Sequence, residues 1–300
     1  MNTPKLYIIG NGFDLWHEIP SNYWQFKDFV RKHDKDLLDT VDNYLPAGDD
    51  WSDLESALGA IDIDNIVDDL GHFMPSYGAD DWSESGHGDF QYEVDRLVQR
   101  LSTRLKLRFG QWIRQLPIPT AATVRQRLQT IDPTARFLTF NYTLTLRDLY
   151  GVPDSHVLHI HGRADLPDGD LVLGHSWSPL ERKSLNDRPD IEDIDTRLME
   201  ANNILDTYFT STFKPSAELI RIHRPFFELL AGIEEVIVLG HSLSEVDEAY
   251  FKALLAIPSV VTARWQIACR SNDDPNTKLT RLQELGVQAT AIMTCAWDDI

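Results

Sequence analysis

The sequence predicts an α/β protein with a doubly wound, mostly parallel, Rossmann-like sheet and a large helical insertion after the first strand. A short apolar run at residues 5–9 ends in Gly10-Asn11-Gly12, as a strand followed by a tight turn does. Apolar residues then recur at helical spacing over much of residues 20–130. From residue 136 onward, short β-type runs alternate with helical ones, which is the pattern of a parallel sheet wound with helices.

These patterns give one Rossmann-like domain over residues 1–300, with residues 20–130 as a helical insertion subdomain. After the first strand, further strands are expected at 136–140, 156–160, 171–173, 235–239, 265–268 and 288–293. Helices are expected near 143–150, 194–211, 217–231, 245–256 and 276–285. Residues 71–89 are rich in Gly and acidic residues and poor in aliphatic ones, so we expect a loop or an active-site flap there.

The composition excludes several classes of protein. No apolar run approaches the roughly 18 residues of a membrane span, and the apolar start at residues 6–9 is too short for a signal peptide. The net charge of -19 argues against nonspecific binding of nucleic acid, which needs clustered Lys and Arg. The two cysteines, Cys269 and Cys295, cannot form a four-cysteine zinc site. We therefore expect a cytoplasmic protein.

Polar motifs follow the first two strands that flank the expected insertion. Gly10 and Gly12 let the backbone turn tightly and approach a phosphate, although the third glycine of the dinucleotide fingerprint is absent. A plain tight turn remains the competing interpretation. Asn141 follows the strand at 136–140, where its amide could hydrogen-bond a ribose hydroxyl or fix a water, or could serve as the N-cap of the next helix.

A histidine-rich run, His156-Val-Leu-His159-Ile-His161-Gly162, marks the end of the next strand. In an extended strand His159 and His161 share one face, as a metal pair would, but no third ligand is evident from the sequence. His161 stands at the strand end, where a general base fits. We expect His159 to be a hydrogen-bonded core histidine.

The fourth motif, Gly240-His241-Ser242-Leu243-Ser244, nearly spells the nucleophile elbow of α/β-hydrolases. In that class the catalytic histidine comes after the serine, whereas every histidine here lies at or before His241. The motif order therefore excludes a serine hydrolase of this kind. A related Gly174-His175-Ser176 occurs earlier, and the sequence leaves open whether His175 or Asp247 lines the same site.

Four stretches of this chain together resemble the AbiH family of bacteriophage abortive infection proteins: IIGNGFDLWHEIPSNYWQF, TFNYTLTLRDLY, HIHG and VIVLGHSLSEVD. More distantly, their order is similar to that of SIR2-like, sirtuin-type NAD-binding proteins. This resemblance implies NAD as ligand or substrate, with Asn141 beside the nicotinamide ribose and His161 as the catalytic histidine. It implies contacts with the cofactor for Gly10, Asn11, Gly12, Asp14, Gly240 and Ser242. The paired CxxC motifs of sirtuins are missing, so protein deacylation is not expected.

The resemblance implies a phage-defence protein that binds NAD and hydrolyses its nicotinamide glycosidic bond, without a metal. Two alternatives stay open: a non-catalytic sensor or regulatory module that binds NAD or ADP-ribose, and a metal-dependent hydrolase or nuclease. A homo-oligomer or a phage-derived trigger is an expected partner, because a defence effector needs restraint in healthy cells. The sequence does not distinguish among these functions, since fold alone does not fix chemistry.

Overall fold

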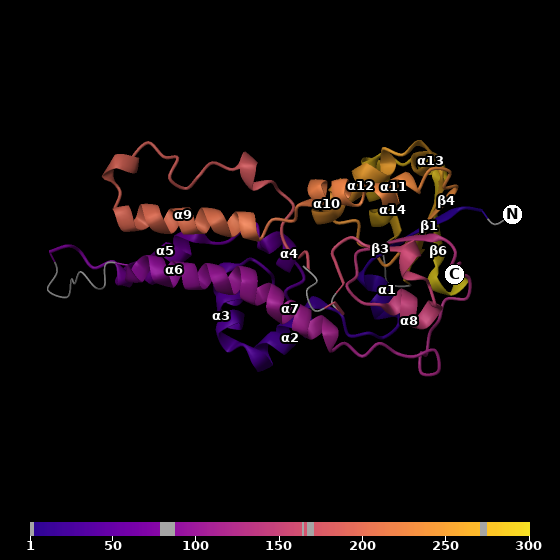
Figure 1. The fold of residues 1–300 in the computed structure, drawn as a ribbon, viewed down its shortest axis with the longest axis horizontal. Coiled ribbons are helices and arrows are strands. Elements are labelled where there is room, and N and C mark those ends of the chain that lie inside the picture. Colours follow the sequence, from indigo (N-terminus) through magenta and orange to yellow (C-terminus); the bar gives the residue numbers. More distant parts are fainter. Residues whose placement is uncertain (1–2, 79–87, 164, 167–170, 271–274) are drawn as a thin grey trace. The chain divides into compact units, whose positions relative to one another are not determined.

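The computed structural model describes residues 3–78, 88–163, 165–166, 171–270 and 275–300 (Figure 1). Its internal contacts divide the chain into two compact units. We call them the sheet unit, formed by Met1–Asn22, Trp112–Val172 and Pro215–Ile300, and the helical unit, formed by Tyr23–Gln111 and Leu173–Lys214. Most of the expected helical insertion thus lies in the helical unit, which a second segment after the third strand completes.

Within the described residues, six strands form one all-parallel sheet in the order β3-β2-β1-β4-β5-β6. This confirms the predicted Rossmann-like fold class, with a long helical segment after β1. The connections run outward in one direction from β1 to β3 and in the other from β4 to β6, so the topology reverses between β1 and β4. The strands are β1 Lys5–Ile9, β2 Arg136–Thr139, β3 Val157–His159, β4 Glu235–Leu239, β5 Arg264–Cys269 and β6 Ile292–Ala296.

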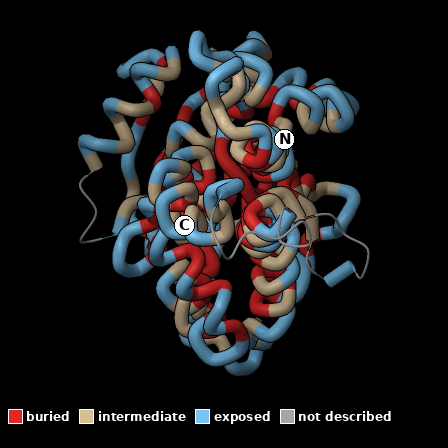
Figure 2. The backbone as a smooth tube through the Cα atoms, turned by 90° about the vertical axis from the view of Figure 1, so that its left-hand side faces the viewer, coloured by how far each residue is buried: buried red, intermediate tan, exposed pale blue. Residues whose placement is uncertain are grey.

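The central strands of the sheet are buried on both faces, which explains why they are continuously apolar. Figure 2 shows buried residues in red along the backbone. Leu6 and Ile8 of β1 belong to one apolar cluster, whereas Tyr7 and Ile9 belong to the other. The first cluster is covered by α10 Ser216–Ile222, α11 Arg224–Glu228, α12 Glu248–Leu255, α13 Pro258–Thr262 and α14 Pro275–Leu285. The second is covered by α1 Asn11–Trp16 and α8 Thr145–Tyr150.

Two sequence predictions of secondary structure are wrong, and the last strand, predicted at 288–293, spans Ile292–Ala296. Residues 171–173 form no strand; the Val172 N–H donates to the His161 carbonyl, and Leu173 is buried by side-chain packing rather than by a strand ladder. The helix expected at 217–231 is two helices, because Pro225, the second residue of α11, has no N–H with which to continue the hydrogen bonds of α10. The segment 71–89 starts with a 3-10 turn at Gly71–Phe73, and its residues 79–87 lie outside the described residues.

The helical unit packs long helices around its own buried residues. Its helices are α2 Tyr23–His33, α3 Lys35–Tyr44, α4 Leu54–Ala57, α5 Ile63–Leu70, α6 Asp89–Gln99, α9 Thr196–Ser211 and most of α7 Leu105–Arg114. Helices α6 and α9, distant in sequence, lie side by side (Figure 1). The buried Asp34 carboxylate accepts hydrogen bonds from Arg104 and Arg108, which joins the start of α3 to the region of α7.

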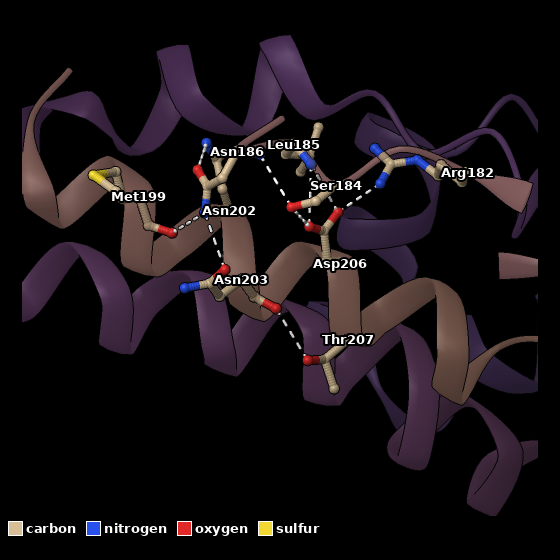
Figure 3. A network of polar contacts seen from close by, with 9 residues as sticks. All are labelled: Arg182, Ser184, Leu185, Asn186, Met199, Asn202, Asn203, Asp206 and Thr207. Atoms are coloured by element: carbon tan, nitrogen blue, oxygen red, sulfur yellow. Dashed lines mark hydrogen bonds and ion pairs between the residues drawn. The ribbon is translucent and has the colours of Figure 1, made fainter. Parts of the chain in front are cut away.

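A polar network fixes the segment before α9 onto that helix (Figure 3). Asp206 of α9 accepts hydrogen bonds from the Arg182 guanidinium, the Ser184 hydroxyl and the Leu185 N–H. About two turns nearer the start of α9, the Asn186 side chain donates to the Met199 carbonyl. Asp206 and Asn186 take the place of water as hydrogen-bond partners of these groups. Directed hydrogen bonds therefore hold the chain at residues 182–186 against α9.

No helix among the described residues combines the length and apolar content that crossing a membrane requires.

Candidate functional site

The motifs predicted from the sequence follow the carboxyl ends of four adjacent strands. Residues 10–14 follow β1, Asn141 follows β2, His161 follows β3, and residues 240–242 follow β4. All four belong to the sheet unit, and β1 and β4 flank the point where the topology reverses. In open parallel sheets ligands bind beyond the carboxyl ends of the strands, next to this point.

Glycines allow the β1 and β4 loops to touch through their backbones. The Gly12 N–H donates to the Gly240 carbonyl at 2.8 Å, and the Phe13 N–H donates to the Gly10 carbonyl at 2.9 Å. A Cβ atom on Gly10 would lie 2.5 Å from the His241 Cα atom, and one on Gly240 would lie 2.2 Å from the Phe13 nitrogen. Glycine is therefore required here because the two loops approach each other closely. The backbone N–H groups of Gly12 and Phe13 both donate to carbonyls within these loops.

Asn11 holds the chain that leaves α1. Its side-chain Nδ2 donates to the Ser21 carbonyl at 2.9 Å, while the Ser21 hydroxyl donates to Asn11 Oδ1 at 2.6 Å. This paired contact fixes the start of α1 against the end of the first segment of the sheet unit. Ser242, in contrast, is exposed in the β4 loop between the buried residues His241 and Leu243.

Asp14 and Asn141 join the β1 and β2 loops in a buried network. The Asp14 carboxyl accepts hydrogen bonds from the hydroxyls of Thr143 and Thr145, at 2.6 and 2.7 Å. Asn141 Nδ2 donates to the Gly10 carbonyl at 3.1 Å. Burial raises the pKa of Asp14 to about 6, against the opposing effect of hydrogen bonds from Thr143, Thr145 and Asn141. The network fixes the Asn141 amide nitrogen, so its amide oxygen is the atom suited to meet a ligand or water.

Replacing Asp14 with Asn is expected to change how stability depends on pH. Since the folded pKa is about 6, above that of an unfolded Asp, the carboxyl's contribution is greatest below about pH 4 and falls as pH rises to 6. When the pH is raised from 5 to 7.5, the free energy of unfolding of wild type, measured with urea, should fall by about 1 kcal/mol relative to that of Asp14→Asn. Asp64→Asn, at an exposed carboxyl, is the control. If the difference in unfolding free energy between Asp14→Asn and wild type is the same at pH 5 and pH 7.5, the raised pKa of Asp14 is contradicted.

His161 lies with two further ionisable residues after β3 and β4. Its side chain is 3% exposed, and its Nε2 lies 3.6 Å from Asp247 Oδ1. The other carboxylate oxygen, Asp247 Oδ2, lies 3.4 Å from Nε2 of His241, whose side chain is equally buried. The Phe140 ring packs against both imidazoles, with centroids 5.3 Å from His161 and 4.2 Å from His241. The carboxylate thus lies between two imidazoles beside the strand that leads to Asn141.

The hydrogen bond from the Leu243 N–H to His241 Nδ1, 2.9 Å long, fixes the tautomer of His241. Because Nδ1 accepts this bond, the proton of the neutral ring is on Nε2, the nitrogen that faces Asp247. Leu243 has a positive φ of 61° and Gly240 one of 70°, so the loop is tightly turned. A non-glycine residue in the left-handed region costs energy that surrounding contacts must offset, as is common at functional sites.

Two other histidines have partners that assign them structural roles. His159 Nδ1 donates to the Asn141 carbonyl at 3.0 Å, and burial lowers the pKa of His159 to about 4, which agrees with a hydrogen-bonded core histidine. His175 belongs to the helical unit, where its Nε2 donates to the Phe209 carbonyl. In the described part of the chain, no group of three or more His, Cys, Asp or Glu side chains could hold a metal ion.

Sequence reasoning did not assign His241 and Asp247 to the site. The local signal is His241-Ser-Leu-Ser-Glu-Val-Asp247, a histidine and an acid on either side of a short turn after a buried strand. His161 follows a strand in the other half of the sheet. Its contact with Asp247 is therefore a tertiary contact, which the spacing of residues in the sequence does not reveal.

A comparison with protein families finds that the model described as "Bacteriophage abortive infection AbiH" matches residues 6–269. The match contains the residues described above after all four strands, from residues 10–14 to Asp247, and it includes parts of both units. No curated protein and no solved structure matches the chain.

Proposed function

Because the chain belongs to the bacteriophage abortive infection AbiH family, we propose that its sheet unit binds NAD and hydrolyses the bond between nicotinamide and ribose. The observation that carries this proposal is the grouping of strand-end residues on neighbouring strands. Asn141 is hydrogen-bonded to the Gly10 loop, and His161 follows the adjacent strand with a carboxylate beside it. A small set of polar groups at the carboxyl edge of a parallel sheet is suited to a nucleotide.

The reaction needs few protein groups. Water attacks C1′ of the nicotinamide ribose, the C1′–N bond breaks, and its electron pair neutralises the pyridinium, so nicotinamide leaves without a general acid. The attacking water releases one proton, and ADP-ribose is the second product. In this proposal the Asn141 amide oxygen positions the water, and His161 takes its proton before passing it to solvent. The β1 and β4 loops, with Gly12 and Gly240 in contact, form the surface along which the diphosphate lies.

The test is NAD loss and nicotinamide release by purified wild-type protein, compared with Asn141→Ala and His161→Ala. Loss of a positioned general base should lower turnover by about 100-fold or more. His156→Ala is the matched control, since His156 comes directly before β3, at the amino end of the strand, whereas His161 follows its carboxyl end. Circular dichroism confirms that each variant is folded. The same variants, expressed in bacteria, show whether cellular NAD falls on phage infection.

The alternative functions give different results. Calorimetry on purified protein shows whether NAD binds. If NAD binds but is consumed neither by the purified protein nor in infected cells, hydrolysis is contradicted and a regulatory nucleotide-binding module is favoured. A hydrolytic activity that EDTA abolishes and a divalent cation restores would favour the metal-dependent class. If the two variants hydrolyse NAD at the wild-type rate, the assigned residues are wrong.

A further inference from the structure

In the His161–Asp247–His241 cluster, the surrounding backbone fixes the position of Asp247 and the tautomer of His241. Asp247 ends the 3-10 turn Glu245–Asp247 that leads into α12, so its backbone is anchored by a helix start. Its side chain is 14% exposed and both imidazoles are 3% exposed. His241 is fixed in one tautomer by Leu243, with its Nε2 proton on the side of Asp247. His241 therefore presents an N–H toward the carboxylate and does not compete as a second base through that nitrogen.

We propose that Asp247 orients His161 and stabilises its protonated form during NAD hydrolysis, and that His241 is a positioning residue that holds Asp247. The inference deepens the proposed function and rests on it for the reaction. The assignment of Asp247 to His161 rests on geometry alone.

Electrostatics explains why a buried base needs this neighbour. When His161 takes a proton, a positive charge forms on a side chain that is almost fully removed from water, which is costly without a compensating anion. The rings of Tyr142 and Tyr250 also lie beside His161, at centroid distances of 6.3 and 5.4 Å, and neither supplies a carboxylate. The Asp247 carboxylate faces the His161 Nε2 atom at 3.6 Å. The distances of 3.6 and 3.4 Å exceed those of charge-assisted hydrogen bonds, and in this proposal the contact between Asp247 and His161 shortens when the His161 ring gains its proton.

A purely structural cluster would have a different consequence. If Asp247 only tied the β4–α12 turn to the end of β3, its replacement would change stability without selectively changing the chemical step. The distinction is therefore between kcat and KM in folded variants. Asp247→Asn keeps the shape of the side chain and removes its charge, while Glu245→Gln makes the same chemical change at an exposed site in the same turn.

We expect Asp247→Asn to lower kcat for NAD hydrolysis by about 10- to 100-fold, with KM changed less than about threefold. Glu245→Gln keeps the wild-type kcat. Two replacements of His241 separate its two hydrogen-bonding atoms. Gln places an amide nitrogen where Nε2 was and retains donation to Asp247, whereas Asn places an amide oxygen near Nδ1 and retains only the bond from Leu243. His241→Gln should therefore preserve most of kcat, and His241→Asn should lower it.

A readout without turnover keeps the two proposals distinguishable. NMR titration of the His161 ring should give a measured pKa lower by about one pH unit or more in Asp247→Asn than in wild type, and unchanged in Glu245→Gln. If wild type does not hydrolyse NAD, the proposed function fails while this titration still decides the pairing. An unchanged His161 titration, or a wild-type kcat in folded Asp247→Asn, would overturn the inference.

Discussion

Glu55→Gln is expected to lower the free energy of unfolding by about 3 kcal/mol at neutral pH, because it removes the carboxylate that pairs with a buried ammonium. Lys214 is fully buried in the helical unit, with its Nζ 2.5 Å from Glu55 Oε2. The Tyr23 hydroxyl donates to the other oxygen, Oε1, at 2.6 Å. A charge removed from water depends on its counter-ion far more than a surface pair does.

Lys214→Met tests this reading from the other side. Glu55 is 22% exposed and keeps its bond from Tyr23, so losing Lys214 should cost less than losing the Glu55 charge. The double variant Glu55→Gln, Lys214→Met should then be more stable than Glu55→Gln alone, because it leaves no buried ammonium at this position. Urea unfolding followed by circular dichroism measures all four proteins. Additive losses in the double variant would show that the charge pairing is not what the site depends on.

The central strands could be predicted from sequence because their signal is local. The predicted bounds of β1 and β4 agree with Lys5–Ile9 and Glu235–Leu239: both are apolar on two faces and end at a glycine. The last strand was predicted at 288–293 but spans Ile292–Ala296. It is an edge strand with several exposed residues, so apolar runs do not mark its ends.

The candidate site was predictable in its strand-end positions and not in its contacts. The order of strands and motifs placed Asn141 and His161 at one edge of the sheet, because carboxyl ends of parallel strands share an edge. What each side chain bonds is set by tertiary packing. Asn11 pairs with Ser21, and Asp247 reaches His161 from a turn on the other half of the sheet. The two cysteines show the same limit: Cys295 pairs in register with Ala268, and Cys269 lies one position further along β5, so the two side chains face opposite sides of the sheet and form no disulfide with each other.

Gly240→Ala is expected to destabilise the protein by about 3 kcal/mol or more, since it combines left-handed backbone strain with overpacking. The Cβ atom would meet the Phe13 nitrogen at 2.2 Å and the Gly12 carbonyl carbon at 2.4 Å. These are backbone atoms, which cannot rotate away as a side chain can. Relief of the clash has to separate the β4 loop from the start of α1 and stretch the bond between the Gly12 N–H and the Gly240 carbonyl.

Gly151→Ala is the matched control, because it changes a glycine of the same unit with nearly the same positive φ. Gly151 has φ 66° against 70° for Gly240, and a Cβ atom there would meet nothing within 4 Å. It should cost only the strain of a left-handed alanine, about 1–2 kcal/mol. The difference between the two variants in urea unfolding therefore isolates the contact between the loops. Under the proposed function, Gly240→Ala also loses NAD binding while Gly151→Ala retains it, since only the former moves the loops that meet beyond β1 and β4. Equal losses of stability would mean that the loops tolerate separation and that the glycine is required for its backbone conformation alone.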